Sequence, residues 1–152
     1  MGYSIANKLG TEYLSARTVR ENDAVMFDID DTLLYTDGTP IEEIVDLFHT
    51  SMRLGYRVII ITARPDHTDI HDYTRQQLVS HELFPHEVYF VPPEEKDAVK
   101  RQTGLNYVLS VGDLETDLGL SDAFIKLPDI FDSNVYSNIQ DGGTPFVLRE
   151  GQ

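Results

Sequence analysis

The chain has 152 residues, and its 26 acidic against 12 basic residues give a formal charge of −14 at pH 7. This length suits one domain with one core, and the hydrophobic fraction of 41% argues against intrinsic disorder. The charge disfavours nucleic acid and anionic membranes as partners, because both bind positive surfaces. The chain contains no cysteine, which excludes disulfides and thiolate metal sites.

No apolar run reaches the length that spans a membrane, and residues 1–22 lack the apolar stretch of a secretory signal. We therefore expect a soluble, cytoplasmic protein. The loosely spaced apolar residues of this N-terminal segment predict one modest helical extension laid against the rest of the domain.

Apolar runs that end in polar residues predict five strands, and these alternate with helices along the chain. The predicted strands are residues 24–28, 58–61, 88–91, 107–111 and 123–127. The predicted helices are residues 40–54, 66–81 and 95–103, with a helical turn at 116–120. Thr39 is expected to cap the first of these helices, and Glu42 to complete a capping box. Beyond Pro128 the pattern weakens, so residues 131–152 are expected to form a loose C-terminal segment.

Strands that alternate with helices at this pace predict right-handed crossovers and a mainly parallel sheet covered on both faces. The fold class is therefore α/β, as a three-layer α/β/α sandwich. No internal repeat and no linker rich in Gly, Ser and Pro divides the chain, so residues 23–130 are expected to form one domain.

Polar residues suited to chemistry follow three of the predicted strands and open one helix. They are Asp28 with Asp30, Thr62, Asp113 with Asp117, and Lys96. Because the carboxyl ends of parallel strands share one edge of a sheet, these side chains are expected to gather there. Clustered carboxylates favour a hard cation with oxygen ligands, most simply Mg²⁺.

Each residue also has an ordinary structural interpretation. The two pairs of acids are typical of turns and helix caps, and Thr62 is typical of a hydroxyl that bonds the backbone. Lys96 is typical of a solvated helix lysine, and Lys100, one turn later, is a rival for any role. Their joint occurrence in order, each at the end of a strand or the start of a helix, favours a functional site.

With these residues in place, the chain resembles the haloacid dehalogenase (HAD) phosphatase superfamily over residues 24–127. Four motifs carry the likeness. They are Asp28-Ile-Asp30-Asp-Thr32 after a hydrophobic strand, Thr62 ending the next, Lys96 upstream of the fourth, and Gly112-Asp113 with Asp117. The chain is most similar to the branch of acid phosphatases and polynucleotide 3′-phosphatases, in which Asp-Asp-Thr-Leu and Thr-Ala-Arg are common.

The resemblance implies a Rossmann-like sheet in the order 5-4-1-2-3 and Mg²⁺-dependent phosphoryl transfer. Asp28 would be the nucleophile that forms an aspartyl phosphate, and Asp30 the general acid and base. The carboxylates of Asp28 and Asp113 and the backbone carbonyl of Asp30 would bind the metal, with Asp117 orienting these ligands. The residues expected to contact substrate are Thr62, Ala63, Arg64 and Lys96. For Arg64, a salt bridge with an acid such as Asp66 stays equally open.

The spacing of the motifs leaves no room for a cap domain, because 34 positions separate Asp28 from Thr62 and another 34 separate Thr62 from Lys96. An open site admits bulky phosphorylated substrates, including macromolecular ends, or is closed by another subunit. We therefore expect a phosphorylated small molecule or macromolecular end as substrate, and an oligomer stays open.

A Mg²⁺-dependent phosphomonoesterase is the function that the sequence favours. The charge weighs against a polynucleotide 3′-phosphatase, whereas a phosphoprotein phosphatase is an equal alternative. A non-enzymatic phosphate-binding or interaction protein on the same scaffold is the second class, and the presence of both Asp28 and Asp30 argues against it. A phosphoacceptor receiver domain fits less well, since it lacks the Asp-x-Asp-x-Thr register.

Overall fold

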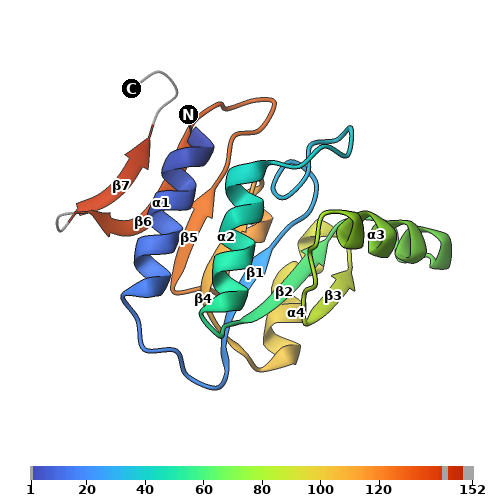
Figure 1. Ribbon diagram of the computed structural model, residues 1–152, viewed down its shortest axis with the longest axis horizontal. Helices are drawn as coiled ribbons and strands as arrows, with labels where there is room; N and C mark the ends of the chain where they lie inside the picture. The colour runs from blue at the N-terminus through green and yellow to red at the C-terminus, as the bar shows by residue number, and fades with distance from the viewer. Residues whose placement is uncertain (1, 142–143, 149–152) are drawn as a thin grey trace.

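The computed structural model describes residues 2–141 and 144–148, and side chains as far as Ile139. The described residues form one seven-stranded sheet in the order β3-β2-β1-β4-β5-β6-β7 (Figure 1). The strands are β1 (Asp23–Phe27), β2 (Arg57–Thr62), β3 (Glu87–Phe90), β4 (Asn106–Gly112), β5 (Ala123–Lys126), β6 (Val135–Asp141) and β7 (Thr144–Leu148). Strands β1 to β5 pair in parallel, and β6 and β7 are antiparallel. The predicted α/β class with a mainly parallel sheet is confirmed.

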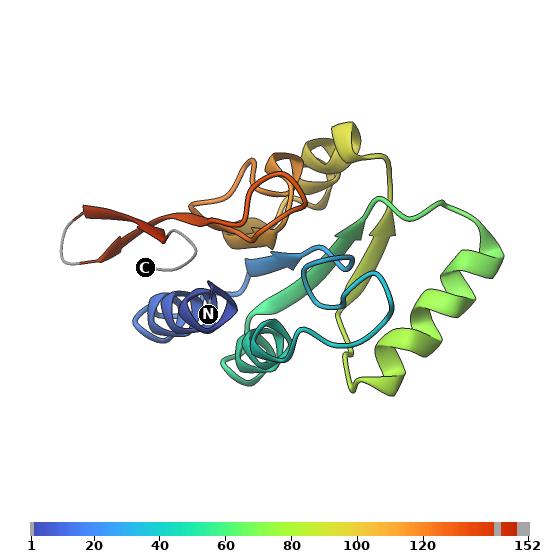
Figure 2. The ribbon, with the colours of Figure 1, turned by 90° about the horizontal axis from the view of Figure 1, so that it is seen from above.

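Helices lie on both faces of this sheet. They are α1 (Gly2–Ser15), α2 (Glu42–Arg53), α3 (Thr68–Ser80) and α4 (Lys96–Thr103), with short 3₁₀ turns η1 (Pro93–Glu95) and η2 (Glu115–Asp117). Figure 2 shows α1 and α2 on one face, α4 on the other, and α3 outside the β3 edge. None of the described helices has the length and apolar character needed to cross a membrane.

The central strands are buried on both faces, which explains their continuous apolar sequence. Val25 and Phe27 of β1 belong to the core cluster that includes residues of α1 and α2, and Met26 belongs to the cluster that includes Val99 of α4. This division follows from the alternation of side chains along a strand. Because β1 is packed on both faces, Asp28, the next residue, is held at the edge of the sheet between the two helical layers.

The predicted N-terminal helix is present and is an integral part of the core. Ala6, Leu9 and Leu14 are buried, and the hydroxyl of Tyr56 donates a 2.7 Å hydrogen bond to the carbonyl of Leu14. Gly10 permits the close approach of α1 to α2, since a Cβ atom there would lie 2.8 Å from a methyl group of Leu47.

The predicted cap of α2 is wrong. The helix begins at Glu42, with Ile41 as its N-cap and no side-chain cap. Thr39 instead donates from both its amide (2.9 Å) and its hydroxyl (2.6 Å) to Asp37. The reason is a hairpin over residues 33–41, closed where the amide of Ile41 donates to the carbonyl of Leu33 at 2.8 Å. The hairpin removes Thr39 from the helix start.

The C-terminal segment also differs from the expectation of a loose stretch, because β6 pairs with β5 and β7 pairs with β6. Val135, Ser137 and Ile139 are buried in alternation with more exposed neighbours, which is the period of a strand. Residues 142–143 and 149–152 of this segment lie outside the described residues.

Candidate active site at the carboxyl edge of the sheet

Three carboxylates meet at the carboxyl end of the central strands. One oxygen each of Asp28, Asp113 and Asp117 lies within 4.8 Å of the other two, and all three residues are buried. Asp28 directly follows β1, and Asp113 directly follows β4, its parallel neighbour. The amide of Asp28 donates to the carbonyl of Val111 at 3.2 Å, so the pairing with β4 continues one residue past β1. The structure therefore brings together three of the four acids singled out in the sequence.

Gly112 explains how Asp117 returns to the cluster. A Cβ atom at position 112 would overlap the side chain of Asp117, so only glycine leaves room for this carboxylate. One Asp117 oxygen accepts a 3.2 Å hydrogen bond from the amide of Leu114, which closes the η2 turn. The spacing of Gly112, Asp113 and Asp117 thus has a steric reason.

Lys96 is the cation of the cluster. Its Nζ lies 2.5 Å from an oxygen of Asp117 and 3.3 Å from an oxygen of Asp28, and the side chain is 1% exposed. Burial by itself would lower the pKa of Lys96, but the two carboxylates outweigh it and raise the pKa above its ordinary value. Lys96 therefore stays charged and fixes the Asp28 carboxylate in position.

Lys100, the rival lysine, does not face the acids. Its Nζ donates to the hydroxyl of Ser110 (2.9 Å) and to the carbonyls of Asp117 (2.8 Å) and Gly119 (2.6 Å). Burial lowers its pKa to about 8. Lys100 therefore holds the backbone of the turn that carries Asp117, while Lys96 meets the carboxylates.

The acid cluster has the electrostatics of a cation site. Burial, followed by repulsion from Asp117, raises the pKa of Asp28 well above its ordinary value, against the attraction of Lys96. Burial likewise raises the pKa of Asp113 to about 6. Oδ1 of Asp113 is buried, and no atom of the described residues hydrogen-bonds to it. Three buried carboxylates, one of which has an oxygen without a partner among the described residues, fit a hard divalent cation such as Mg²⁺.

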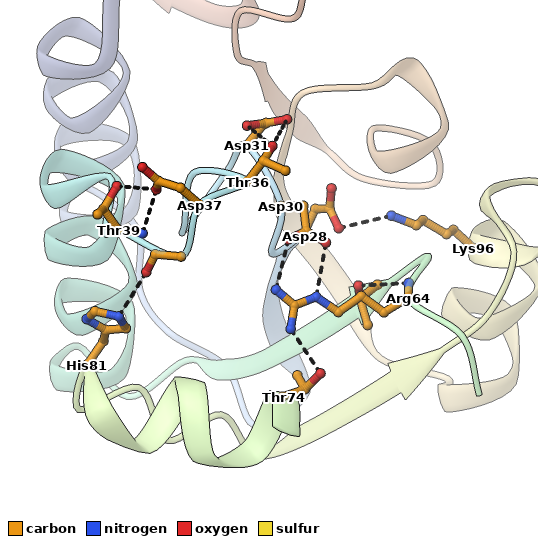
Figure 3. A network of polar contacts seen from close by, with 12 residues as sticks. Asp28, Asp30, Asp31, Thr36, Asp37, Thr39, Arg64, Thr74, His81 and Lys96 are labelled. Carbon is orange, nitrogen blue, oxygen red and sulfur yellow. Dashed lines mark hydrogen bonds and ion pairs between the residues drawn. The ribbon is translucent and has the colours of Figure 1, made fainter. Parts of the chain in front are cut away.

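Asp30 lies outside this cluster. Both of its carboxylate oxygens accept hydrogen bonds from Arg64, at 3.0 Å from Nε and 2.8 Å from Nη2 (Figure 3). Arg64 thus pairs with Asp30, and the suggested alternative partner, Asp66, lies 2.8 Å from Nε2 of His71. The backbone carbonyl of Asp30 as a metal ligand stays a prediction.

The turn after Asp28 separates the two aspartates. The carbonyl of Ile29 accepts hydrogen bonds from the amides of Thr32 (3.2 Å), Leu33 (2.9 Å) and Leu34 (3.0 Å), and these bonds close a tight turn. Asp31 has a φ of 58°, in the left-handed region that aspartate tolerates better than most residues. The chain then enters the 33–41 hairpin, which begins at the same edge as the acids.

Thr62 ends β2 with its side chain buried. Its Oγ1 accepts a 3.2 Å hydrogen bond from the amide of Arg64, which is the ordinary strand-end role, and its hydroxyl hydrogen can still be donated. Ala63, between them, is exposed.

Two further residues at this edge have no signal in the sequence. Thr74 of α3 is buried, and its hydroxyl accepts a 3.0 Å hydrogen bond from Nη1 of Arg64. Tyr3 of α1 packs edge-on against Tyr35 of the hairpin, with ring centroids 6.2 Å apart. Burial raises the pKa of Tyr3 to about 12, with smaller contributions from Tyr35 and nearby acids that include Asp113. Neither contact follows from the periodicity of apolar residues, because one depends on the turn between β2 and α3 and the other joins α1 to the 33–41 hairpin.

Comparison with known proteins adds no relative to this description. No protein-family model matches the chain, and no curated protein is similar to it in sequence. The geometry of the carboxyl edge is therefore the basis for assigning a function.

Proposed function

We propose that this protein is a Mg²⁺-dependent, HAD-type phosphatase that hydrolyses phosphomonoesters through an aspartyl phosphate on Asp28. The observation that carries the proposal is the buried cluster of Asp28, Asp113 and Asp117, with Lys96 against Asp28. The sheet order β3-β2-β1-β4-β5 supports the same assignment, because it places Asp28 between the ends of β2 and β4.

The chemistry assigned to Asp28 is nucleophilic. A carboxylate oxygen of Asp28 attacks phosphorus in line, the phosphorus–oxygen ester bond breaks, and the leaving oxygen takes a proton from Asp30. A water molecule then attacks the phosphoryl group, gives a proton to Asp30, and frees phosphate and the Asp28 carboxylate. A bound Mg²⁺ would supply positive charge against the phosphoryl oxygens and the three acids.

The other residues of the edge orient the reacting groups and offset the negative charge of the phosphate. Lys96 holds Asp28 and opposes the rise in the pKa of Asp28, and its ammonium is close enough to Asp28 to meet a phosphoryl group carried there. Thr62 has a hydroxyl hydrogen to donate to a phosphate oxygen. Asp117 has both oxygens engaged, by Lys96 and by the amide of Leu114, which suits a residue that orients its neighbours.

A phosphate-binding protein without turnover is the second candidate. The observation that favours it is the salt bridge of Arg64, which holds both oxygens of Asp30, the residue that must carry the proton. Hydrolysis therefore requires that this salt bridge opens.

One assay separates the two candidates. Hydrolysis of p-nitrophenyl phosphate is measured with Mg²⁺, with EDTA and for Asp28→Asn, with the exposed Asp46→Asn as the matched control. We expect Asp28→Asn and EDTA each to lower kcat by roughly a thousandfold or more, and Asp46→Asn to match the wild type. Brief reaction with ³²P-labelled substrate should label the protein in a form that hydroxylamine removes. Activity that survives Asp28→Asn would exclude the covalent route, and phosphate binding without any turnover would favour the second candidate.

A further inference from the structure

Arg64 divides its hydrogen bonds between a buried partner and a partly exposed one. Nη1 donates to Thr74, whose side chain is buried in α3, while Nε and Nη2 donate to Asp30, whose side chain is 44% exposed. Arg64 itself is only 13% exposed. Figure 3 shows Arg64 between Thr74 on one side and Asp30 on the other. If one of the two contacts opens, the exposed carboxylate is the one that can leave.

The charges at this edge make Arg64 the available cation for an incoming anion. A phosphate dianion that approaches Asp28 meets the carboxylates of Asp113 and Asp117 as well. Lys96 already contacts two of these acids, so its charge is largely committed. Within the described part of the chain, each terminal nitrogen of Arg64 keeps one N–H without an acceptor. Its carboxylate partner, Asp30, lies only two residues along the chain from Asp28.

We propose, on the basis of the phosphatase function above, that Arg64 exchanges Asp30 for the substrate phosphate, and that Thr74 is the positioning residue for this exchange. A guanidinium fork matches a carboxylate and a phosphate equally well, so one bidentate contact replaces the other. Thr74 keeps Nη1 fixed while the partner changes. The exchange frees both oxygens of Asp30, which then can carry the proton for the leaving group.

The arrangement also couples substrate binding to catalysis. Without a phosphate group, Arg64 engages both oxygens of the proton-carrying residue. With a phosphate group bound, the same cation is withdrawn from Asp30 and placed on the substrate. The side chain expected to transfer the proton thus becomes free only when a phosphate is present. This removes the objection that the observed salt bridge raises against turnover.

Binding of inorganic phosphate tests the exchange without relying on turnover. Its affinity is measured by calorimetry in Mg²⁺ for the wild type, Asp30→Asn, Arg64→Gln and the double variant. Arg75→Gln is the matched control, because Arg75 lies on the exposed side of α3 and pairs with Asp72. We expect Arg64→Gln to weaken phosphate binding by about tenfold and Arg64→Lys to restore part of it. Arg75→Gln should have no effect.

The decisive quantity is the coupling between the two residues. In the proposal, Asp30 competes with phosphate for Arg64. Asp30→Asn should therefore tighten phosphate binding by about fivefold when Arg64 is present, and by less than about twofold when Arg64 has been replaced by Gln. Equal tightening in both backgrounds would show that Asp30→Asn acts only by removing a negative charge, and this result would overturn the exchange. No loss of affinity in Arg64→Gln would overturn it as well. A wild type that binds no phosphate would remove the proposed function together with this inference.

A conservative pair tests the assignment of Thr74. Thr74→Ser keeps the hydroxyl and should bind phosphate like the wild type, while Thr74→Val keeps the shape and should bind about threefold more weakly. Equal affinities for the two variants would show that the hydroxyl has no positioning role. Thermal unfolding of both proteins separates this effect from a loss of folding.

Discussion

The carboxylate of Asp117 lies against Gly112, in the space that a Cβ atom at position 112 would fill. This contact fixes the path of the chain between β4 and η2, and with it the position of the third acid of the cluster. A residue without any side chain therefore determines whether the acids can meet.

Gly112→Ala tests this relationship. The added methyl group has to displace Asp117, so we expect an overpacking cost of about 1–3 kcal/mol in the free energy of unfolding and at least about tenfold weaker Mg²⁺ binding. Urea unfolding and Mg²⁺ titration provide the two measurements. Gly104→Ala is the control, because Gly104 has φ of 67° but nothing within 4 Å of an added Cβ. It should lower stability by about 1 kcal/mol through left-handed strain alone. Unchanged Mg²⁺ binding in Gly112→Ala would contradict this account.

The raised pKa values of Asp28 and Asp113 predict an unusual pH dependence of stability. The folded protein holds protons on these acids up to a higher pH than the unfolded chain does. Between about pH 4 and 6 the unfolded state therefore loses protons that the folded state retains, and stability falls as the pH rises. The shift of Asp113 to about 6 corresponds to about 3 kcal/mol.

Unfolding at pH 5 and at pH 7.5, in EDTA and in Mg²⁺, measures this effect. We expect the protein in EDTA to be less stable at the higher pH and Mg²⁺ to remove the difference, since the cation favours the ionised acids. Asp113→Asn should flatten the dependence, because the amide does not titrate. Parallel curves for Asp113→Asn and the wild type would show that Asp113 is not the source.

Replacing Lys96 or Lys100 by Met should change the affinity for Mg²⁺ in opposite directions. Lys96→Met removes a cation from among three acids, so Mg²⁺ should bind more tightly while turnover falls by about a hundredfold or more. Lys100→Met removes the donors that hold the carbonyls of Asp117 and Gly119, so Mg²⁺ should bind more weakly. Mg²⁺ titrations of both variants and of the wild type provide the comparison. A similar weakening in both would mean that Lys96 acts only on the fold.

Helix α1 should contribute strongly to stability. Leu14 is fully buried, so Leu14→Ala should lower the free energy of unfolding by about 2–4 kcal/mol. Val79 of α3 is 50% exposed, and Val79→Ala should change the free energy of unfolding by less than about 0.5 kcal/mol. Urea unfolding of the two variants decides between a core helix and a dispensable extension. A small effect at Leu14 would favour the latter.

The elements that the sequence predicted correctly are those fixed by local patterns. One example is the β-branched run of β2, which favours a strand, and another is Gly104, which ends α4. Asp28 lies close to Asp113 because both follow parallel strands that end at the same edge of the sheet. The carboxyl edge of a parallel sheet follows from topology, so its residues could be predicted without knowing any side-chain contact.

The features that the sequence did not predict depend on turns. Asp30 points to Arg64 because the chain bends at Ile29 and Asp31, and no pattern in the sequence gives a left-handed residue at that position. The neighbours of Thr39 predict a helix cap there, but the hairpin competes for the same residue. Thr74 is one polar residue among many on α3 until Arg64 is placed beside it.

The first turn of α1 has a practical consequence for anyone who purifies this protein. A Cβ atom on Gly2 would lie 2.9 Å from a methyl group of Val135, and Tyr3 contacts the hairpin that follows the acids. A histidine tag fused before Gly2 would therefore begin beside Val135 and near this hairpin, where its extra residues would crowd both contacts. Metal titrations call for protein from which such a tag has been cleaved.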